Sequence, residues 1–330
     1  MDSIPVYVGL DYHDSVVQVC VLDGAGEVLC NRPRGNDCEE IVEQAGRFGA
    51  VMRAAVEACT GSADLAEELV QRGWPVDLAH PGYVARMKQN PDKHDFGDAR
   101  MLADLERVGY LPRVWLAPEE TRELRRLVRY RQTLVNRRRD TRLRIRALLR
   151  EHRVKGPGRA WSRAWMCWVG NVDLPEQSRW ILGRHLRDVE VLSRQILEVE
   201  KRLHRVTRKD PLVQRLLQQS GIGPVTAWTM RAEIGRFDRF RSGKQLARFC
   251  GLTPRNASSG QRQADAGLIR AGNPQLRATL IEAAQRLRRT DPRWQDFSER
   301  LTAAGKSGSV ATAAVANRWI RWLYHQMVAA

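Results

Sequence analysis

The sequence has 330 residues, of which 43% are hydrophobic and 28% are charged, and its formal net charge is +17. Its apolar runs are too short for a membrane span, its start lacks the basic-then-apolar order of a signal peptide, and its six cysteines form no Cys-x-x-Cys pair. These features argue against a membrane protein, a secreted protein and a zinc ribbon. The remaining expectation is a cytoplasmic globular protein with two cores and a polyanionic partner, nucleic acid first.

The first 118 residues predict an α/β domain with a mixed sheet. Two β-rich runs, Val6–Leu10 and Val16–Leu22, come before a hairpin turn at Asp23–Gly26. This order, continued by alternating helices and strands, is typical of a sheet with antiparallel and parallel neighbours. The later helices are expected at 38–48 and 64–72, and the later strands at 50–56 and 75–78.

Four carboxylates stand where these elements end or begin. Asp11 and Glu57 each close a predicted strand, whereas Asp95 and Asp98 lie on one face of the first turn of an amphipathic helix. Because the ends of neighbouring strands gather along one edge of a sheet, the four side chains can converge on divalent metal, and Mg²⁺ prefers such oxygen ligands. The alternative is structural, with Asp95 as an N-cap, Asp98 as a partner of the helix dipole, and the strand-end acids as turn residues.

Residues 119–210 predict a helical connector rich in arginine. One long helix is expected over Thr121–Arg153, and its nearly single-signed charge favours contact with a phosphate backbone over a solvated face. A second long helix over Pro175–Val206 carries heptad-spaced apolar residues, so the pair predicts either an antiparallel hairpin or an intermolecular coiled coil. The arginines predicted to contact nucleic acid are Arg125, Arg129, Arg137, Arg138, Arg142 and Arg146.

An aromatic stripe follows the Gly-Pro-Gly break between the two long helices. Trp161, Trp165 and Trp168 stand four and three residues apart, which is helical spacing. A stripe of this kind is more often buried than exposed for base stacking. We therefore predict that the three side chains form a core.

Residues 211–330 predict a mainly helical domain. Gly221 and Gly223 lie between two helical runs, where they form either an ordinary turn or a phosphate contact like that of a helix-hairpin-helix. Arg255 and Arg262 flank a polar loop and are predicted to contact nucleic acid. The final helix, 310–327, is interpreted as core and interface.

Two groups of motifs resemble those of a known family. The first group looks like the four-acid signature of the DEDD transposases, which include the Piv/MooV-type DNA invertases and the insertion-sequence family one-ten recombinases. It consists of Gly9-Leu10-Asp11, Glu57-Ala58-Cys59-Thr60-Gly61 and Lys93-x-Asp95-x-x-Asp98-Ala99-Arg100. Here Cys59 interrupts what is usually Glu-Ala-Thr-Gly. The second signature of the family is matched by Gly251-Leu252-Thr253-Pro254, then Ser259-Gly260, then Gly272-Asn273.

The resemblance implies a RuvC-like (RNase H-like) N-terminal domain, a coiled-coil connector and a helical transposase domain. The metal ligands would be Asp11, Glu57, Asp95 and Asp98, with two Mg²⁺ ions per site. Ser259, or its neighbour Ser258, would be the nucleophile that attacks DNA. The resemblance further implies active sites that are shared between protomers of a homo-oligomer, a dimer or a tetramer, and a structured guide (bridge) RNA.

The sequence as a whole therefore predicts a bacterial, nucleoid-associated transposase that cleaves and rejoins double-stranded DNA at the ends of an insertion sequence. One alternative is a RuvC-like junction nuclease that hydrolyses DNA with water and has no serine step. Another is an invertase that acts without RNA, and a third is an architectural nucleic-acid binder without chemistry. The nuclease is predicted to keep cleavage in Ser259→Ala, and the architectural binder to show no chemical effect of Asp11→Asn, whereas the invertase is a variant of the main interpretation that these residues do not exclude.

Overall fold

The computed structural model describes residues 4–87, 94–256, 265–269 and 272–328. The chain forms two compact units, Met1–Pro118 and Glu119–Ala330. None of the helices within these ranges combines the length and the hydropathy that a membrane span requires.

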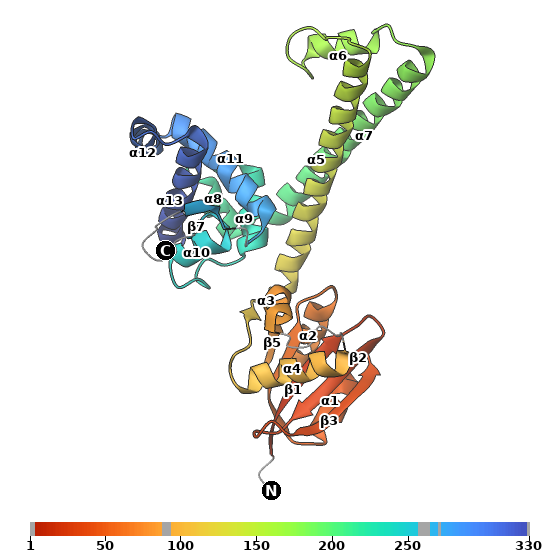
Figure 1. Cartoon of the computed structure of the whole chain (residues 1–330), viewed down its shortest axis with the longest axis vertical. Coiled ribbons are helices and arrows are strands. Elements are labelled where there is room, and N and C mark those ends of the chain that lie inside the picture. The colour runs from red at the N-terminus through yellow and green to blue at the C-terminus, as the bar shows by residue number, and fades with distance from the viewer. Residues whose placement is uncertain (1–3, 88–93, 257–264, 270–271, 329–330) are drawn as a thin grey trace. The chain divides into compact units, whose positions relative to one another are not determined.

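The first unit is built on a mixed sheet of six strands in the order β3-β2-β1-β4-β5-β6 (Figure 1). β1, β2 and β3 form an antiparallel meander, whereas β1, β4 and β5 are parallel neighbours and β6 is antiparallel to β5. The predicted α/β domain with mixed pairing is confirmed. The strands are β1 (Pro5–Tyr12), β2 (Val16–Leu22), β3 (Val28–Gly35), β4 (Ala50–Glu57), β5 (Val76–Ala79) and β6 (Arg113–Val114).

Helices cover both faces of this sheet. Ile41 of α1 and Leu65 of α2 pack with Val6 and Val8 of β1 in the main apolar core. On the opposite face, Ala99 and other small residues of α4 pack on β1 and β2. Alternate residues of β1 therefore serve different cores, as the twofold period of a strand requires. The helices are α1 (Cys38–Gly46), α2 (Ser62–Gln71), α3 (Pro81–Met87) and α4 (Asp95–Arg107).

A buried carboxylate anchors the end of α4. The side chain of Glu106 is fully buried, and its Oε1 accepts a hydrogen bond of 2.6 Å from Arg113 Nη2. Asp77 on β5 binds Arg113 at 2.9 Å and Arg53 at 2.8 Å, which joins three strands and the helix in one ionic network. Burial raises the pKa of Glu106 above its ordinary value, although the hydrogen bond from Arg113 opposes this shift.

The second unit begins with a helical hairpin formed within one chain (Figure 1). Leu134 of α5 packs with Leu192 and Ile196 of α7, and Arg131 of α5 binds Glu200 of α7 at 2.6 Å. Of the two pairings that the heptads allowed, the structure has the intramolecular one. The hairpin consists of α5 (Glu119–Glu151) and α7 (Glu176–Thr207), with α6 (Arg163–Gly170) at the end where the chain turns.

The rest of the second unit is a helical lobe with its own apolar core. Fully buried Trp319, Ile320 and Leu323 of α13 pack there with Leu280 of α11, which confirms the core interpretation of the final helix. Leu124 and Val128 of α5 join the same core, so the hairpin and the lobe are continuous. The division into a connector, 119–210, and a C-terminal domain, 211–330, stays a prediction. The lobe contains α8 (Pro211–Leu217), α9 (Pro224–Ile234), α10 (Gly243–Phe249), β7 (Pro254–Asn256), β8 (Asp265–Leu268), α11 (Pro274–Thr290), α12 (Pro292–Ala303) and α13 (Gly308–Val328).

Candidate functional site

Parallel pairing of β1 and β4 brings two predicted acids to the same edge of the sheet. Leu10 of β1 lies opposite Val56 of β4, so the next residues, Asp11 and Glu57, are neighbours along that edge. The third element of the site is α4, whose first residue is Asp95. The three segments that carry the four predicted acids thus meet as the sequence suggested.

Close approach of α4 to β1 depends on Gly9. A Cβ atom built at this position would lie 2.5 Å from the backbone nitrogen of Ala103 and closer still to the carbonyl oxygen of Ala99. Only a residue without a side chain allows the helix to rest directly on the strand. Because Asp11 lies two residues beyond Gly9, this contact fixes the distance between Asp11 and the first turn of α4.

A histidine that the sequence analysis did not single out completes the cluster. His13 Nε2 lies 3.5 Å from Asp11 Oδ2 and 3.5 Å from Asp95 Oδ2. Burial raises the pKa of Asp11, the nearby His13 lowers it, and the negative charges of Asp98, Asp95 and Glu57 raise it further. The other three acids are therefore close enough to raise the pKa of the Asp11 carboxyl group. The only sequence signal for His13 was its position two residues after Asp11, which puts both on one side of an extended chain.

The donor set of this cluster fits a divalent cation. Asp11, His13 and Asp95 each offer one ligand atom, and these atoms lie within 4.8 Å of one another. Asp11 Oδ2 and His13 Nε2 are shielded from solvent and have no hydrogen-bond partner among the described atoms. Nitrogen and oxygen ligands bind such ions at about 2.0–2.2 Å, which separates neighbouring ligands by about 3–3.5 Å. One cation could coordinate both atoms.

Hydrogen bonds hold the first turn of α4 in place. Asn31 Nδ2 on β3 donates to the carbonyl oxygen of Phe96 at 2.9 Å, and Asn31 Oδ1 accepts from Gln18 Nε2 at 2.7 Å. Gln18 is in turn the β2 partner of Asp11. The N-cap of the helix is His94, which makes no capping hydrogen bond with its side chain, so the alternative that Asp95 is an N-cap is wrong.

Backbone conformation and a hydrogen bond explain why glycine and serine occupy positions 61 and 62 in the loop after Glu57. Gly61 has a φ of +90° at the N-cap of α2, and a Cβ atom there would lie 2.7 Å from Cζ of Tyr12. Ser62 Oγ accepts from the backbone nitrogen of Cys59 at 2.9 Å and closes the loop. The Cys59 side chain is exposed, so this departure from the family pattern disturbs no packing.

Two of the six arginines predicted to contact nucleic acid bind residues of α9. Arg129 binds both carboxylate oxygens of Glu233, at 2.9 and 3.0 Å. Arg125 donates to the carbonyl oxygen of Ala232 at 3.0 Å and lies 3.6 Å from Glu233, and burial lowers its pKa. Their guanidinium groups therefore fasten α5 to α9, and contact of Arg125 and Arg129 with nucleic acid stays a prediction.

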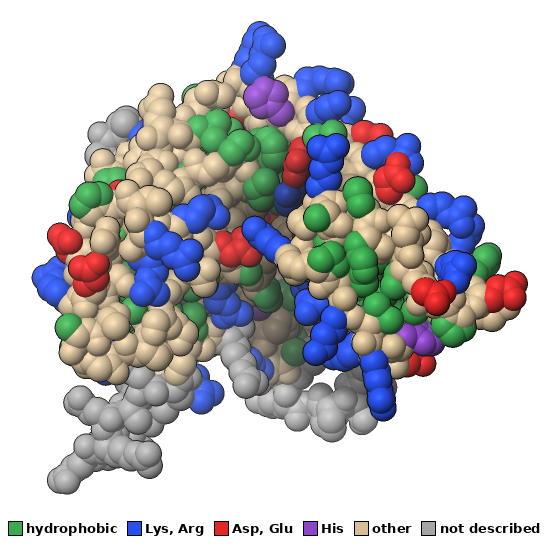
Figure 2. Space-filling model, turned by 90° about the horizontal axis from the view of Figure 1, so that it is seen from above, with side chains coloured by type: hydrophobic (Ala, Val, Ile, Leu, Met, Phe, Trp, Pro, Cys, Tyr) green, Lys and Arg blue, Asp and Glu red, His purple; other side chains and the backbone are tan. Residues whose placement is uncertain are grey.

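The other four arginines lie farther along α5. Arg138 donates to Ser193 Oγ at 3.3 Å, and the guanidinium of Arg142 lies 4.6 Å from the centre of the Trp161 ring. Arg137 and Arg146 are exposed and form no salt bridge with any residue that the structure describes. Lys and Arg side chains are prominent on the face drawn in Figure 2, in keeping with the net charge.

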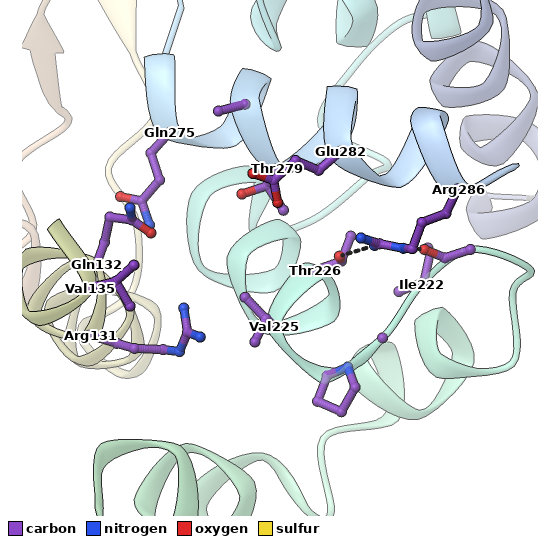
Figure 3. A pocket seen from close by; sticks show the side chains of 14 residues that line it. Arg131, Gln132, Val135, Ile222, Val225, Thr226, Gln275, Thr279, Glu282 and Arg286 are labelled. Carbon is purple, nitrogen blue, oxygen red and sulfur yellow. Dashed lines mark hydrogen bonds between the residues drawn. The ribbon is translucent and has the colours of Figure 1, made fainter. Parts of the chain in front are cut away.

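Gly221 and Gly223 border a cavity of about 650 Å³ within the second unit (Figure 3). Arg131 of α5 and Arg286 of α11 point toward it from opposite sides, and Arg286 Nη2 lies 3.5 Å from Thr226 Oγ1 and 3.3 Å from the carbonyl oxygen of Gly221. The first residues of α9, Pro224 to Thr226, also line this cavity, and helix starts are common phosphate sites in proteins. The cavity keeps both interpretations of the glycine turn open.

The predicted nucleophile lies outside the described residues. Ser258, Ser259 and Arg262 belong to the range 257–264, which the structure does not describe. The strands that flank this range, β7 and β8, pair with each other, and Arg255 on β7 is exposed.

Comparison with known proteins links both halves of the chain to transposases. Residues 8–154 match the family model of the DEDD transposases of the IS110 group, and residues 213–299 match that of the transposase IS116/IS110/IS902 family. A probable family 20 transposase of Pseudomonas aeruginosa is 29% identical over 96% of this chain and 95% of its own length. The transposase for insertion sequence element IS1111A of Coxiella burnetii is 27% identical over 85% of this chain and 77% of its own. A putative transposase of Sinorhizobium fredii is 34% identical over 54% of this chain and 48% of its own.

Proposed function

The chain belongs to the IS116/IS110/IS902 family of transposases, and we propose that it cleaves and rejoins DNA through a serine-linked intermediate. Its N-terminal unit is proposed to be RuvC-like, which the antiparallel meander joined to parallel β1, β4 and β5 supports. The observation that carries the proposal is the cluster of Asp11, His13 and Asp95, to which β1 and α4 contribute. Glu57 and Asp98 are near enough to raise the pKa of Asp11, and Asp11 Oδ2 is buried without a hydrogen-bond partner among the described residues.

The acids are proposed to hold divalent metal, with Mg²⁺ as the expected ion and two ions per site. Asp11, Asp95 and His13 would hold one ion, and Glu57 and Asp98 would complete the site. When bound, such ions neutralise the charge that develops on the scissile phosphate and on its attacking and leaving oxygens. The chain's own contribution is to keep Asp11 partly buried and the first turn of α4 fixed, so that little reorganisation is needed.

Ser259 is proposed as the nucleophile, with Ser258 as the alternative. Its Oγ attacks the scissile phosphorus, the bond to the 3′ oxygen breaks, and the 5′ phosphate becomes esterified to the serine, while the serine proton ends on the freed 3′ oxygen. The freed 3′ hydroxyl of another strand then attacks this phosphoserine and releases the serine hydroxyl. Each step exchanges one phosphodiester bond for another, so no ATP is needed. A serine hydroxyl is a weak nucleophile that needs a base, and no histidine neighbours Ser259 in the sequence.

The proposed partners of the chain are inferred from its resemblance to the family and from its positive net charge. The serine loop and the acids are proposed to meet across protomers of a homo-oligomer, as the family resemblance implies. A structured guide RNA is proposed to set the target, and exposed basic residues such as Arg137 and Arg146 are available for its phosphates and for those of DNA. In such systems base pairing, rather than side chains, reads the sequence.

The proposal is tested with end-labelled DNA that carries the element junction, in the presence of Mg²⁺ and of the cellular RNA that copurifies with the protein. Asp11→Asn, Glu57→Gln and Asp98→Asn should each abolish cleavage while DNA binding persists. Asp104→Asn is the matched control, because Asp104 lies on the same helix as Asp98 but is exposed and paired with Arg107 at 2.6 Å. Full activity of the acid variants would contradict the proposal.

Two further arms of this experiment separate the alternatives. Cleavage without any joined product would favour a junction nuclease that uses water. RNase treatment should abolish the reaction if RNA is the guide, whereas an RNA-independent invertase would retain it. An architectural binder would cleave under none of these conditions.

A further inference from the structure

The hairpin tip, defined here as the end of α5, the turn with α6, and the start of α7, has an apolar core of its own. Ile145 and Leu149 of α5 pack there with Trp165 of α6 and with Leu182 of α7. Trp165 is buried and its ring centre lies 4.6 Å from that of Trp161, which confirms its predicted place in a core. A packed core lets the tip hold a fixed surface shape.

That surface contains a cavity of about 620 Å³, and every charged residue that lines it is a cation. Four cations line it, together with Leu149, Trp165 and backbone of the turn, and no acidic side chain does. None of the four forms a salt bridge among the described parts of the chain, and all four are exposed. The four are Arg146, Arg150, Arg153 and Lys155.

Arg153 occupies a backbone position that usually belongs to glycine. Its φ is +59°, and the helix ends around it with a hydrogen bond of 2.9 Å from Val154 N to the carbonyl oxygen of Leu149. This is the pattern of a Schellman ending, in which the left-handed residue is most often glycine because a side chain there is strained. Strain that is kept at one place in a structure is a reason to look for a function of the side chain.

The only other described non-glycine residue with a positive φ is Trp161, at +68°, and it belongs to the same tip. Its ring makes a cation–π contact with the guanidinium of Arg142, which lies one helical turn before Arg146. Arg153 lines the cavity itself, whereas Trp161 lies beside it, with its ring centre 4.6 Å from that of the cavity-lining Trp165.

We propose that the cationic cavity of the hairpin tip binds the phosphate backbone of the DNA substrate, as a contact additional to the site of cleavage. The cations match phosphate in charge, and their number fits a short stretch of strand held through its backbone, without reading of base identity. DNA is the partner chosen because the family's reaction acts on DNA, and the inference rests on the proposed function in this respect only.

The test is a DNA-binding titration of the full chain over a range of salt concentrations, without divalent metal so that no chemistry occurs. Arg150→Ala, Arg153→Gly and the double variant are compared with Arg144→Ala. Arg144 is a fair control because it is exposed on the same helix, carries the same charge and does not line the cavity. Each phosphate contact that is lost should lower the slope of log affinity against log salt by about 0.9.

Arg153→Gly gives the most diagnostic result. It removes a strained conformation, so its midpoint of thermal unfolding should equal or exceed that of the wild type, while its DNA affinity should fall equally for all DNA sequences. An unchanged affinity and salt slope would overturn the proposal, and so would an equal loss in Arg144→Ala, which would mean that only net charge matters.

A parallel titration with RNA of the same sequence identifies the partner. If the cavity variants lost affinity for RNA but not for DNA, the assignment to DNA would be overturned. Failure of the proposed chemistry would look different, because variants of the acids or of Ser259 would lose cleavage or joining while the salt slope of DNA binding stayed that of the wild type.

Discussion

Replacement of Gly9 by alanine is the sharpest perturbation of the candidate metal site that touches none of its ligands. The new Cβ would lie 2.5 Å from the backbone nitrogen of Ala103. Ordinary contacts of carbon atoms are about 3.5–4.0 Å, so α4 would have to retreat by about 1 Å. Overpacking of this kind costs about 1–3 kcal/mol of folding free energy.

The displacement should reduce activity by more than the loss of stability explains. Asp95 and Asp98 belong to the first turn of the helix that has to retreat, whereas Asp11 stays on the strand. A misplacement of about 1 Å at reacting groups can cost on the order of 10²-fold in rate. We therefore expect Gly9→Ala to remain folded at 25 °C, to bind Mn²⁺ more weakly, and to lose about two orders of magnitude in DNA cleavage.

Urea unfolding, Mn²⁺ binding and cleavage are measured on the same preparation. Gly97→Ala is the control, because Gly97 lies in the same helix between the two acids and a Cβ there would meet nothing within 4 Å. It should stabilise the helix by about 0.5–1 kcal/mol and leave metal binding intact. Wild-type behaviour of Gly9→Ala, or equal damage from Gly97→Ala, would refute the reasoning.

Three further predictions concern the first unit. Burial raises the pKa of Glu106, so its contribution to stability is fully present below the ordinary pKa of a glutamate, about 4.3, and is lost as the pH rises through the folded value. Urea unfolding at increasing pH should show this decline in the wild type but not in Glu106→Gln. Asn31→Ala removes the hydrogen bonds to Phe96 and Gln18, so it should cost about 1–2 kcal/mol and loosen the first turn of α4, which a weaker Mn²⁺ affinity would report. Gly61→Ala should cost about 2 kcal/mol or more by thermal unfolding, since it combines a φ of +90° with a clash; a stable variant would count against that account.

Most elements of the first unit were predictable because their signals are local, whereas α3 and β6 were not predicted. Every residue of β2 after Val16 is buried, and its β-branched run was readable without knowledge of its partners. Gly9 and Gly61 belong to sequence motifs, but glycine is required there by contacts with residues far away in the sequence. Gly9 contacts Ala103, and Gly61 contacts Tyr12. His13 was missed because a lone histidine next to acids has no characteristic spacing, and its role depends on where α4 begins.

The partners of the arginines of α5, by contrast, could not be predicted from local sequence patterns. A run of one charge predicts a binding surface, yet Arg129 finds its carboxylate in Glu233, more than a hundred residues later in the sequence. The choice of an intramolecular hairpin likewise rests on a pairing, Arg131 with Glu200, that no local pattern contains. Trp165 was predictable as core, whereas the cation-lined cavity beside it follows from the backbone of Arg153, which the sequence does not reveal.

The central claim is that DNA strands are exchanged through a serine ester at a site built with the four acids. A covalent-adduct assay tests it most directly. Purified protein with its bound RNA is mixed with labelled junction DNA and Mg²⁺, denatured, and separated on a gel. The account predicts a protein–DNA band that is absent in Ser259→Ala and in Asp98→Asn but present in Ser258→Ala. Cleaved DNA without any adduct would contradict the serine mechanism.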